Sequence, residues 1–421
     1  MGQQRTLISG GTVIDVLAGT AASNQDILVE GRRIVAIGEK LHAPDATVID
    51  ARGKIVVPGF VDTHRHLWQT ALRSSATDVD LMGYLQRVLG RFGSQFSATH
   101  VGTATLAGAL ECVDSGVTTV LDYSHALHTT NHTDAAIDAL LDSGARAVFG
   151  YGFPMQGERN VDDARRVRRD RLADRDDLVT MILAPVGPSF ATTDAVSDDW
   201  ALADELGVGI TFHVSKGPVT TTPVTALREA GLLREGLIFV HGDTLDDSEL
   251  ELIAEAGSFV SSAPAAEAQF HGGAPVIGRL GQAGVTTSLS VDAVTSAPGD
   301  MFSTMRAAIL GAHVARQSAI SPIDALRMAT INGATVLGMA DRTGSLTAGK
   351  EADIVIVDAL APNMLGASMD PIAALVSAAH PGNIDTVMVA GRVLKANGRL
   401  LRDDLDALAA DIRDVAVATM T

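Results

Sequence analysis

Cysteine and basic residues are scarce in this chain of 421 residues. Cys112 is the only cysteine, which excludes a disulfide framework and a zinc site built from thiolates. The 32 Lys and Arg residues face 50 Asp and Glu residues, and the formal net charge of −18 argues against nucleic acid or an anionic membrane as a partner. No apolar run reaches about 18 residues, the length of a membrane span, and the first residues show no signal-peptide core. We therefore expect a cytoplasmic protein that acts on a small molecule.

Apolar residues, in contrast, make up 46% of the chain. This content predicts a large buried core, and the length accommodates one α/β barrel of about 250 residues plus a smaller module. Short alternating strands with turns occur near both chain ends, at residues 6–15, 26–38, 46–57, 344–358 and 385–401. We predict one composite β-sandwich domain from residues 1–57 and 343–402, followed by a C-terminal helix in residues 403–421.

The middle of the chain, residues 58–342, alternates apolar strands with helical segments. Eight strand candidates occur there or at its edge, at residues 55–66, 118–124, 146–153, 178–186, 207–215, 237–242, 258–264 and 285–293. Near-continuous apolar strands separated by helices indicate a parallel sheet covered on both faces. Eight such units predict a (β/α)8 TIM-like barrel, a fold in which catalytic residues lie at the carboxyl ends of the strands.

Five imidazole and carboxylate groups stand at four of these predicted strand ends. His64 and His66 close the first strand, and strand alternation places both on one face. His213, His241 and Asp292 end the fifth, sixth and eighth strands. Three histidines and one aspartate without a thiol suit a divalent ion such as Zn, Fe or Mn. Such an ion lowers the pKa of a bound water molecule, and a neighbouring carboxylate can accept the proton.

Four blocks of the sequence resemble successive motifs of the amidohydrolase superfamily: "VVPGFVDTHRH", "HVSKG", "VHGDTLDDSEL" and "LSVDAVTSAPGDMFSTMR". They are most similar to its aminohydrolase and chlorohydrolase branch, which acts on N-heteroaromatic rings. The resemblance implies that His64, His66, His213 and Asp292 bind the metal and that Asp292 also accepts a proton. It implies that His241 hydrogen-bonds the attacking water or the developing oxyanion.

The resemblance also implies one metal ion, zinc ahead of iron or manganese, because the fourth strand lacks the lysine that binuclear members carry. Gln69 matches a position that binds polar groups of the substrate. Residues 78–96 resemble a lid over the site, with Tyr84 in its wall, and His125 is a candidate substrate contact. Since large barrels of this kind commonly dimerise, we expect a homodimer.

Two positions depart from the pattern of that branch. Its members carry HxxE after the fifth strand, and the glutamate donates a proton, whereas this chain has Lys216 there. Near the seventh strand, Pro-x-Ser-Asn is replaced by a segment that contains Glu267. Three interpretations stay open. Lys216 pairs with a substrate carboxylate while Glu267 transfers protons, Lys216 and Glu267 neutralise each other, or Lys216 extends into solvent.

The missing glutamate affects the expected reaction, since ring deamination needs a proton on the ring nitrogen. We expect first the hydrolysis of an amide- or amidine-like C–N bond in a cyclic or aromatic substrate, including one that bears a carboxylate. One alternative is a dehydrative cyclase that closes a heterocycle such as a benzoxazole from an ortho-hydroxyaryl ester or amide, with the metal polarising the carbonyl. The other is an N-heteroaromatic deaminase or chlorohydrolase. A non-catalytic assembly role is disfavoured because every expected ligand is present.

Overall fold

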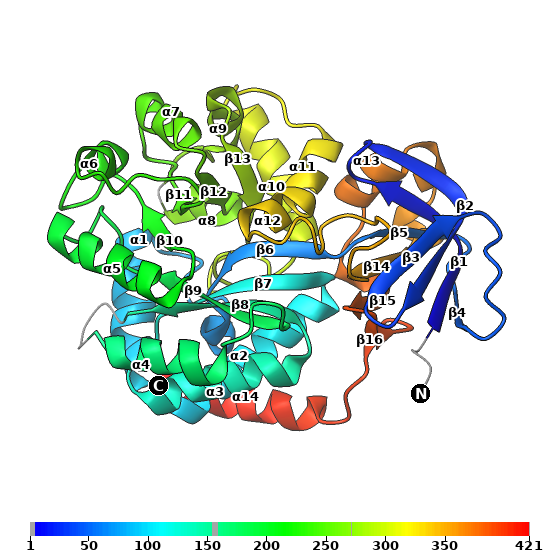
Figure 1. The fold of residues 1–421 in the computed structure, drawn as a ribbon, viewed down its shortest axis with the longest axis horizontal. Helices are drawn as coiled ribbons and strands as arrows, with labels where there is room; N and C mark the ends of the chain where they lie inside the picture. Colours follow the sequence, from blue (N-terminus) through cyan, green and yellow to red (C-terminus); the bar gives the residue numbers. More distant parts are fainter. Residues whose placement is uncertain (1–4, 154–158, 271, 421) are drawn as a thin grey trace.

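A computed structural model describes residues 5–153, 159–270 and 272–420. Two parts lie side by side in Figure 1, a β-domain and a larger α/β barrel. Strands from both ends of the chain share one nine-stranded sheet, which confirms a composite β-domain. Its strands are β1 (Arg5–Asp15), β2 (Thr20–Glu30), β3 (Arg33–Gly38), β4 (Thr47–Asp50), β5 (Lys54–Pro58), β14 (Ile354–Asp358), β15 (Ile384–Val389), β16 (Arg392–Ala396) and β17 (Arg399–Leu400).

The prediction of one strand over residues 55–66 was wrong, because two separate strands occur there. β5 pairs with β1 and β14 in the composite sheet, whereas β6 (Phe60–Arg65) belongs to the barrel. Gly59 separates them, and its N–H donates to the Asp353 carbonyl at 2.9 Å. A Cβ at Gly59 would lie 2.0 Å from Thr118 Oγ1, so only glycine permits this crossing. The first barrel strand therefore leaves the β-domain directly.

The barrel strands form two parallel four-stranded sheets in chain order. Leu183 N–H donates to the Gly209 carbonyl at 3.0 Å across one seam, and Asp292 N–H donates to the His64 carbonyl at 3.0 Å across the other. Isolated bridges at the same two places give a TIM-like arrangement. The strands are β6, β7 (Val117–Ser124), β8 (Arg146–Gly152), β9 (Val179–Ala184), β10 (Thr211–Val214), β11 (Ile238–His241), β12 (Phe259–Ser262) and β13 (Thr286–Leu289).

Helices surround the barrel strands (Figure 1). In chain order they are α2 (Ala98–Asp114), α3 (Thr130–Ser143), α4 (Val161–Arg166), α5 (Thr193–Leu206), α6 (Pro223–Glu229), α7 (Asp247–Glu255), α8 (Pro264–Phe270), α9 (Ile277–Ala283), α10 (Met301–Val314), α11 (Pro322–Met328) and α12 (Ile331–Val336). Two more helices follow, α13 (Pro371–Ser377) and the C-terminal α14 (Leu405–Met420), which packs on α2. No helix within the described residues combines the length and apolarity needed to cross a bilayer.

The predicted lid at residues 78–96 is largely helical. It consists of α1 (Leu81–Tyr84), the π-helical segment η2 (Leu85–Phe92) and the short turn η3 (Gly93–Gln95). Asp80 caps its start, since the carboxylate accepts the Gly83 N–H at 2.9 Å. The lid packs into the barrel core through buried Tyr84, Val88 and Phe92. A preceding 3-10 helix, η1 (Leu67–Leu72), connects the lid region to β6.

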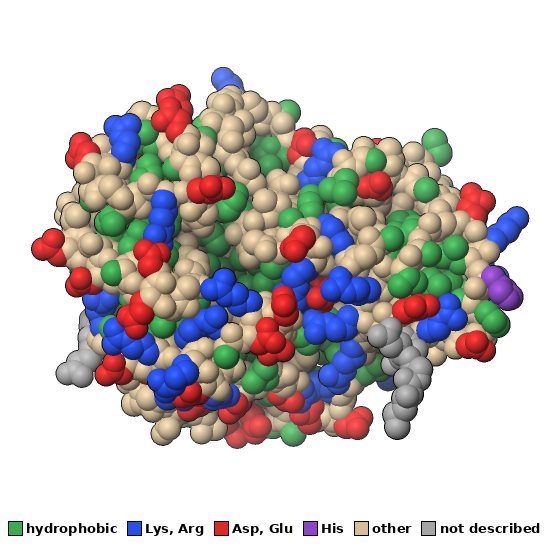
Figure 2. Space-filling view, in the orientation of Figure 1, with side chains coloured by type: hydrophobic (Ala, Val, Ile, Leu, Met, Phe, Trp, Pro, Cys, Tyr) green, Lys and Arg blue, Asp and Glu red, His purple; other side chains and the backbone are tan. Residues whose placement is uncertain are grey.

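A buried network of charges joins the β-domain to the amino-terminal end of the barrel. Arg146, the first residue of β8, donates from Nε to Asp353 at 2.9 Å and from Nη2 to Glu351 at 2.6 Å. Arg342 and Arg32 donate to the same Glu351 carboxylate, at 3.1 and 3.0 Å. The Arg146 side chain is fully buried. On the surface shown in Figure 2, by contrast, basic and acidic side chains are intermingled over both parts of the molecule.

Candidate metal centre and active site

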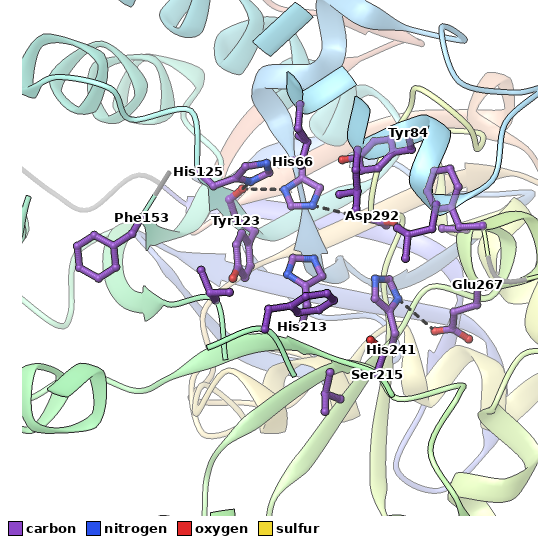
Figure 3. Close-up of a pocket in the computed structure, with 18 residues that line it drawn as sticks. His66, Tyr84, Tyr123, His125, Phe153, His213, Ser215, His241, Glu267 and Asp292 are labelled. Carbon is purple, nitrogen blue, oxygen red and sulfur yellow. Dashed lines mark hydrogen bonds and ion pairs between the residues drawn. The ribbon is translucent and has the colours of Figure 1, made fainter. Parts of the chain in front are cut away.

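Five predicted site residues meet at the carboxyl end of the barrel. Figure 3 shows four of them, His66, His213, His241 and Asp292. His64 belongs to β6 and His66 follows it directly, while His213 and His241 belong to β10 and β11. Asp292 is not at a strand end, since β13 stops at Leu289. The Asp292 N–H donates to the His64 carbonyl, and its carbonyl accepts the His66 N–H at 2.9 Å. These two hydrogen bonds hold Asp292 beside the histidines.

Two of these residues have left-handed backbone conformations, with φ of 70° at His241 and 67° at Asp292. Residues other than glycine rarely adopt this region, which costs of order 1–3 kcal/mol and is found most often at functional sites. In both cases the turn follows the end of a buried strand. The strained turn directs the side chain toward the barrel axis.

The side chains form one compact group of possible metal ligands. One ligand atom from each of His64, His213, His241 and Asp292 lies within 4.8 Å of all the others. His66 Nε2 lies 3.3 Å from Asp292 Oδ1, and His64 Nε2 lies 3.2 Å from the same oxygen. The four predicted ligands therefore lie together, with His241 beside them. The choice of His66 as a ligand in place of His241 stays a prediction.

The protonation states favour cation binding. Burial lowers the pKa values of His64, His66 and His213, the last two well below the ordinary value, so these rings are neutral. Burial alone would raise the pKa of Asp292, but the hydrogen bond from His64 and the nearby imidazoles lower it. His66 Nδ1 donates to the Tyr123 carbonyl at 2.9 Å, which leaves Nε2 available. Neutral imidazoles with one carboxylate fit a zinc ion.

Glu267 is the immediate neighbour of His241. Its Oε1 lies 3.6 Å from His241 Nδ1, and the carboxylate accepts hydrogen bonds from Ser262 Oγ at 3.0 Å and from the Ala263 N–H at 2.7 Å. Burial alone would lower the pKa of His241, but the nearby carboxylates of Glu267 and Asp292 raise it to about 9. The sequence motif pointed to Glu267, but its partner could not be read from the motif.

Lys216 lies outside this group. Its Nζ forms an ion pair with Asp246 at 2.7 Å, and the side chain is 39% exposed. Its backbone N–H donates to Thr244 Oγ1 at 2.8 Å. The described lining of the cavity includes Ser215 but not Lys216. Lys216 therefore pairs with Asp246 and not with Glu267, and its role toward a substrate stays a prediction.

The metal-ligand group opens into a cavity of about 940 Å³, including the part open to solvent. Its walls are mainly apolar and come from the lid, the segments after β8 and β9, the end of β10, and α8: Leu81, Leu85, Leu89, Phe153, Val186, Phe190, Val214, Ala266 and Phe270. Tyr84 and His125 line it as predicted. Gln69 does not, because it is fully buried behind Tyr84 and donates to the Tyr84 hydroxyl at 2.6 Å. It supports the wall and does not form it.

Metal-binding groups at the carboxyl ends of barrel strands, with a carboxylate placed to accept a proton, define a metal-dependent hydrolase. The Amidohydrolase family model matches residues 55–394. The chain belongs to this family, and it is an enzyme that hydrolyses carbon–nitrogen bonds.

Curated relatives carry deaminase names. The chain is 31% identical to a 5-methylthioadenosine/S-adenosylhomocysteine deaminase of Symbiobacterium thermophilum, with 98% of each chain covered. It is 30% identical to a 5'-deoxyadenosine deaminase of Methanothermobacter thermautotrophicus, with 95% of each covered. These names favour the deaminase alternative over the cyclase.

A zinc-bound adenosine deaminase from Xanthomonas campestris has the same fold, with a TM-score of 0.88 and 26% identity over 97% of each chain. The zinc-bound atrazine chlorohydrolase from Arthrobacter aurescens TC1 superposes with a TM-score of 0.87 over 98% of this chain, at 24% identity. The zinc in the first of these structures agrees with the imidazole and carboxylate groups found here.

Proposed function

We propose that the protein is a mononuclear zinc hydrolase that deaminates an amino-substituted N-heteroaromatic ring of the adenine type. Water replaces the amino group on a ring carbon, and the products are the ring carbonyl compound and ammonia. The observation that carries this proposal is that the metal-ligand group faces a cavity with apolar and aromatic walls. A flat heteroaromatic ring buries well against such walls, and the deaminase names of the relatives agree with it.

The cavity favours an uncharged ring over the acidic substrate expected from Lys216. Lys216 is held at the rim by Asp246, and the described lining residues include no lysine or arginine. Tyr84 and Phe270 lie with ring centroids 4.9 Å apart in the wall. They offer aromatic surface for stacking. A carboxylate on the substrate would therefore find no lysine or arginine partner among these described residues.

His64, His66, His213 and Asp292 would hold the zinc ion, which supplies Lewis acidity that lowers the pKa of water. The Asp292 carboxylate accepts the proton that the attacking water loses, because its lowered pKa keeps it ionised beforehand. His241 faces the same space and stabilises charge that develops on the added oxygen. With Lys216 turned away, proton delivery to the ring nitrogen and to the departing amino group falls to Asp292 and His241.

The test is a substrate panel with the zinc-loaded protein. Adenosine, 5'-deoxyadenosine, 5'-methylthioadenosine and an aminotriazine are incubated with it, and ammonia release and product masses are measured. We expect ammonia and the carbonyl product from at least one adenine derivative, and neither after chelation or with His213→Ala. If no amino-heteroaromatic compound releases ammonia, the proposal fails. Loss of water from an ortho-hydroxyaryl amide would identify the cyclase instead.

A further inference from the structure

We propose that Glu267 is a positioning residue whose carboxylate fixes the orientation of the His241 ring at the reaction centre and keeps a proton on its Nδ1. The carboxylate that related enzymes present after the fifth strand is, in this chain, supplied after the seventh strand and acts through an imidazole. The kinetic part of this inference rests on the proposed function, whereas its structural part does not.

The carboxylate of Glu267 is held in place before any substrate binds. Glu267 lies in the first turn of α8, directly after β12, and its side chain is fully buried. Ser262 Oγ donates to both carboxylate oxygens, at 3.0 and 3.1 Å, and the Ala263 N–H donates to Oε1 at 2.7 Å. Three hydrogen bonds and complete burial leave the carboxylate with one position.

This fixed carboxylate determines how His241 lies. Oε1 is 3.6 Å from His241 Nδ1, and Figure 3 shows the His241 ring between Glu267 on one side and His213 and Asp292 on the other. A carboxylate at this place favours a proton on Nδ1, and the opposite side of the ring then faces the metal-ligand group.

Position 216, where related enzymes carry a glutamate, cannot supply a carboxylate to His241 in this chain. Lys216 is held away from the cavity by two contacts to the loop after β11, the Thr244 hydroxyl and the Asp246 carboxylate. The Ser215 backbone is fixed on the other side, since its N–H donates to Ser189 Oγ at 3.0 Å and its carbonyl accepts from the same hydroxyl at 2.8 Å. The cavity lining in the described residues has Asp292 and Glu267 as its carboxylates.

The decisive variant is Glu267→Gln, because it keeps the shape of the side chain. The glutamine carbonyl can take the place of Oε1, where it accepts the Ala263 N–H and faces His241 Nδ1. The variant therefore removes the negative charge that orients the His241 ring and keeps a proton on Nδ1. We expect kcat to fall about 100-fold and KM to stay within about threefold, as for other groups that orient a catalytic imidazole. Zinc content stays at the wild-type level. Glu267→Asp should restore part of the rate, since a carboxylate remains.

Glu249→Gln is the matched control. Glu249 is also buried and also binds the start of a helix, since it accepts the Val224 N–H at 2.7 Å and the Thr225 N–H at 3.1 Å. It belongs to α7 and does not line the cavity. We expect this variant to lose stability without a loss of kcat in the folded, zinc-loaded protein. Equal losses of kcat in both variants would overturn the proposal.

A second measurement does not depend on activity. With histidine labelled by ¹⁵N, the Nδ1 and Nε2 chemical shifts of His241 report which nitrogen carries the proton in the zinc-loaded protein. We expect them to change in Glu267→Gln and not in Glu249→Gln. Unchanged shifts in Glu267→Gln overturn the proposal. If the wild-type protein deaminates no substrate, the proposed function fails, and these shifts still decide the role of Glu267.

Discussion

Buried charges lie at both ends of the barrel strands, but the groups that surround them differ between the two ends. At the amino-terminal end, Arg146 is enclosed by Glu351 and Asp353, and Asp353 also accepts hydrogen bonds from Thr343 and the Ala390 N–H. At the carboxyl end, three neutral imidazoles surround the Asp292 carboxylate and open into a cavity. Charges that are satisfied by the protein stabilise the fold, whereas charges left for a cation and a substrate carry the chemistry.

The largest effect should follow from removing a ligand at the carboxyl end. His213→Ala takes away one imidazole, so zinc content should fall and the rate of ammonia release should drop at least about a thousandfold, or about 4 kcal/mol in barrier. Metal analysis and the ammonia assay measure both effects. The circular dichroism spectrum should stay that of a folded protein. An active variant without metal would contradict the assignment of this end of the barrel to chemistry.

Arg146→Met should produce the opposite result, a large loss of stability without a loss of catalytic activity in the folded protein. It leaves Glu351 and Asp353 buried near the barrel without their shared cation, which should cost about 3–5 kcal/mol in the free energy of unfolding. Urea denaturation measures this loss. Arg165→Met is the control, since Arg165 pairs with Glu205 at an exposed site and should change stability little. Equal losses in the two variants would show that the buried network does not stabilise the fold.

The pH dependence of stability should also separate the two ends. Burial alone would raise the pKa of Glu351, but the charge and hydrogen bond of Arg146, with help from Arg32, lower it from 4.5 to about 2. Because the folded protein has the lower pKa, the stabilisation from this carboxylate is complete above pH 4.5 and is lost as the pH falls toward 2. Urea denaturation at a series of pH values should show a smaller loss in this range for Glu351→Gln than for the wild type.

The smallest effect should come from Lys216→Met. The ion pair with Asp246 is exposed to solvent, and such pairs contribute little to stability. Since the side chain does not line the cavity, kcat and KM should stay within about twofold of the wild type. Steady-state kinetics with the best substrate of the panel test this. A large change in KM alone would show that Lys216 contacts the substrate.

The metal-ligand group could be predicted because its members follow separate strands, and a parallel barrel brings all carboxyl ends to one face. The strand assignments alone bring His64, His66, His213, His241 and Asp292 together. The choice of ligands among them came from the resemblance to the family. The direction of Lys216 could not be predicted in this way. It depends on Thr244 and Asp246 from the next loop, and such contacts between loops leave no periodic pattern in the sequence.

Two further features depended on distant contacts. The division of residues 55–66 into β5 and β6 results from the close approach of Gly59 to Thr118, which no local propensity signals. The charged network around Arg146 joins residues that are far apart in the chain. In the sequence, Arg146 was only the first residue of an apolar strand. The predicted fold was correct, because apolar periodicity reports burial, but it does not report which buried charges meet.

The position of β5 also has a consequence for how the chain is made. β5 needs β1 on one side and β14 on the other, and β14 leaves the ribosome only after the whole barrel has been synthesised. Until then, the edge of β5 that will pair with β14 is unpaired, which is a site for wrong association. The nascent chain therefore must either fold the barrel first or keep this edge covered. Pairing of the last strands with β5 would then be the final step of folding. A chain truncated before β14 should be prone to aggregation.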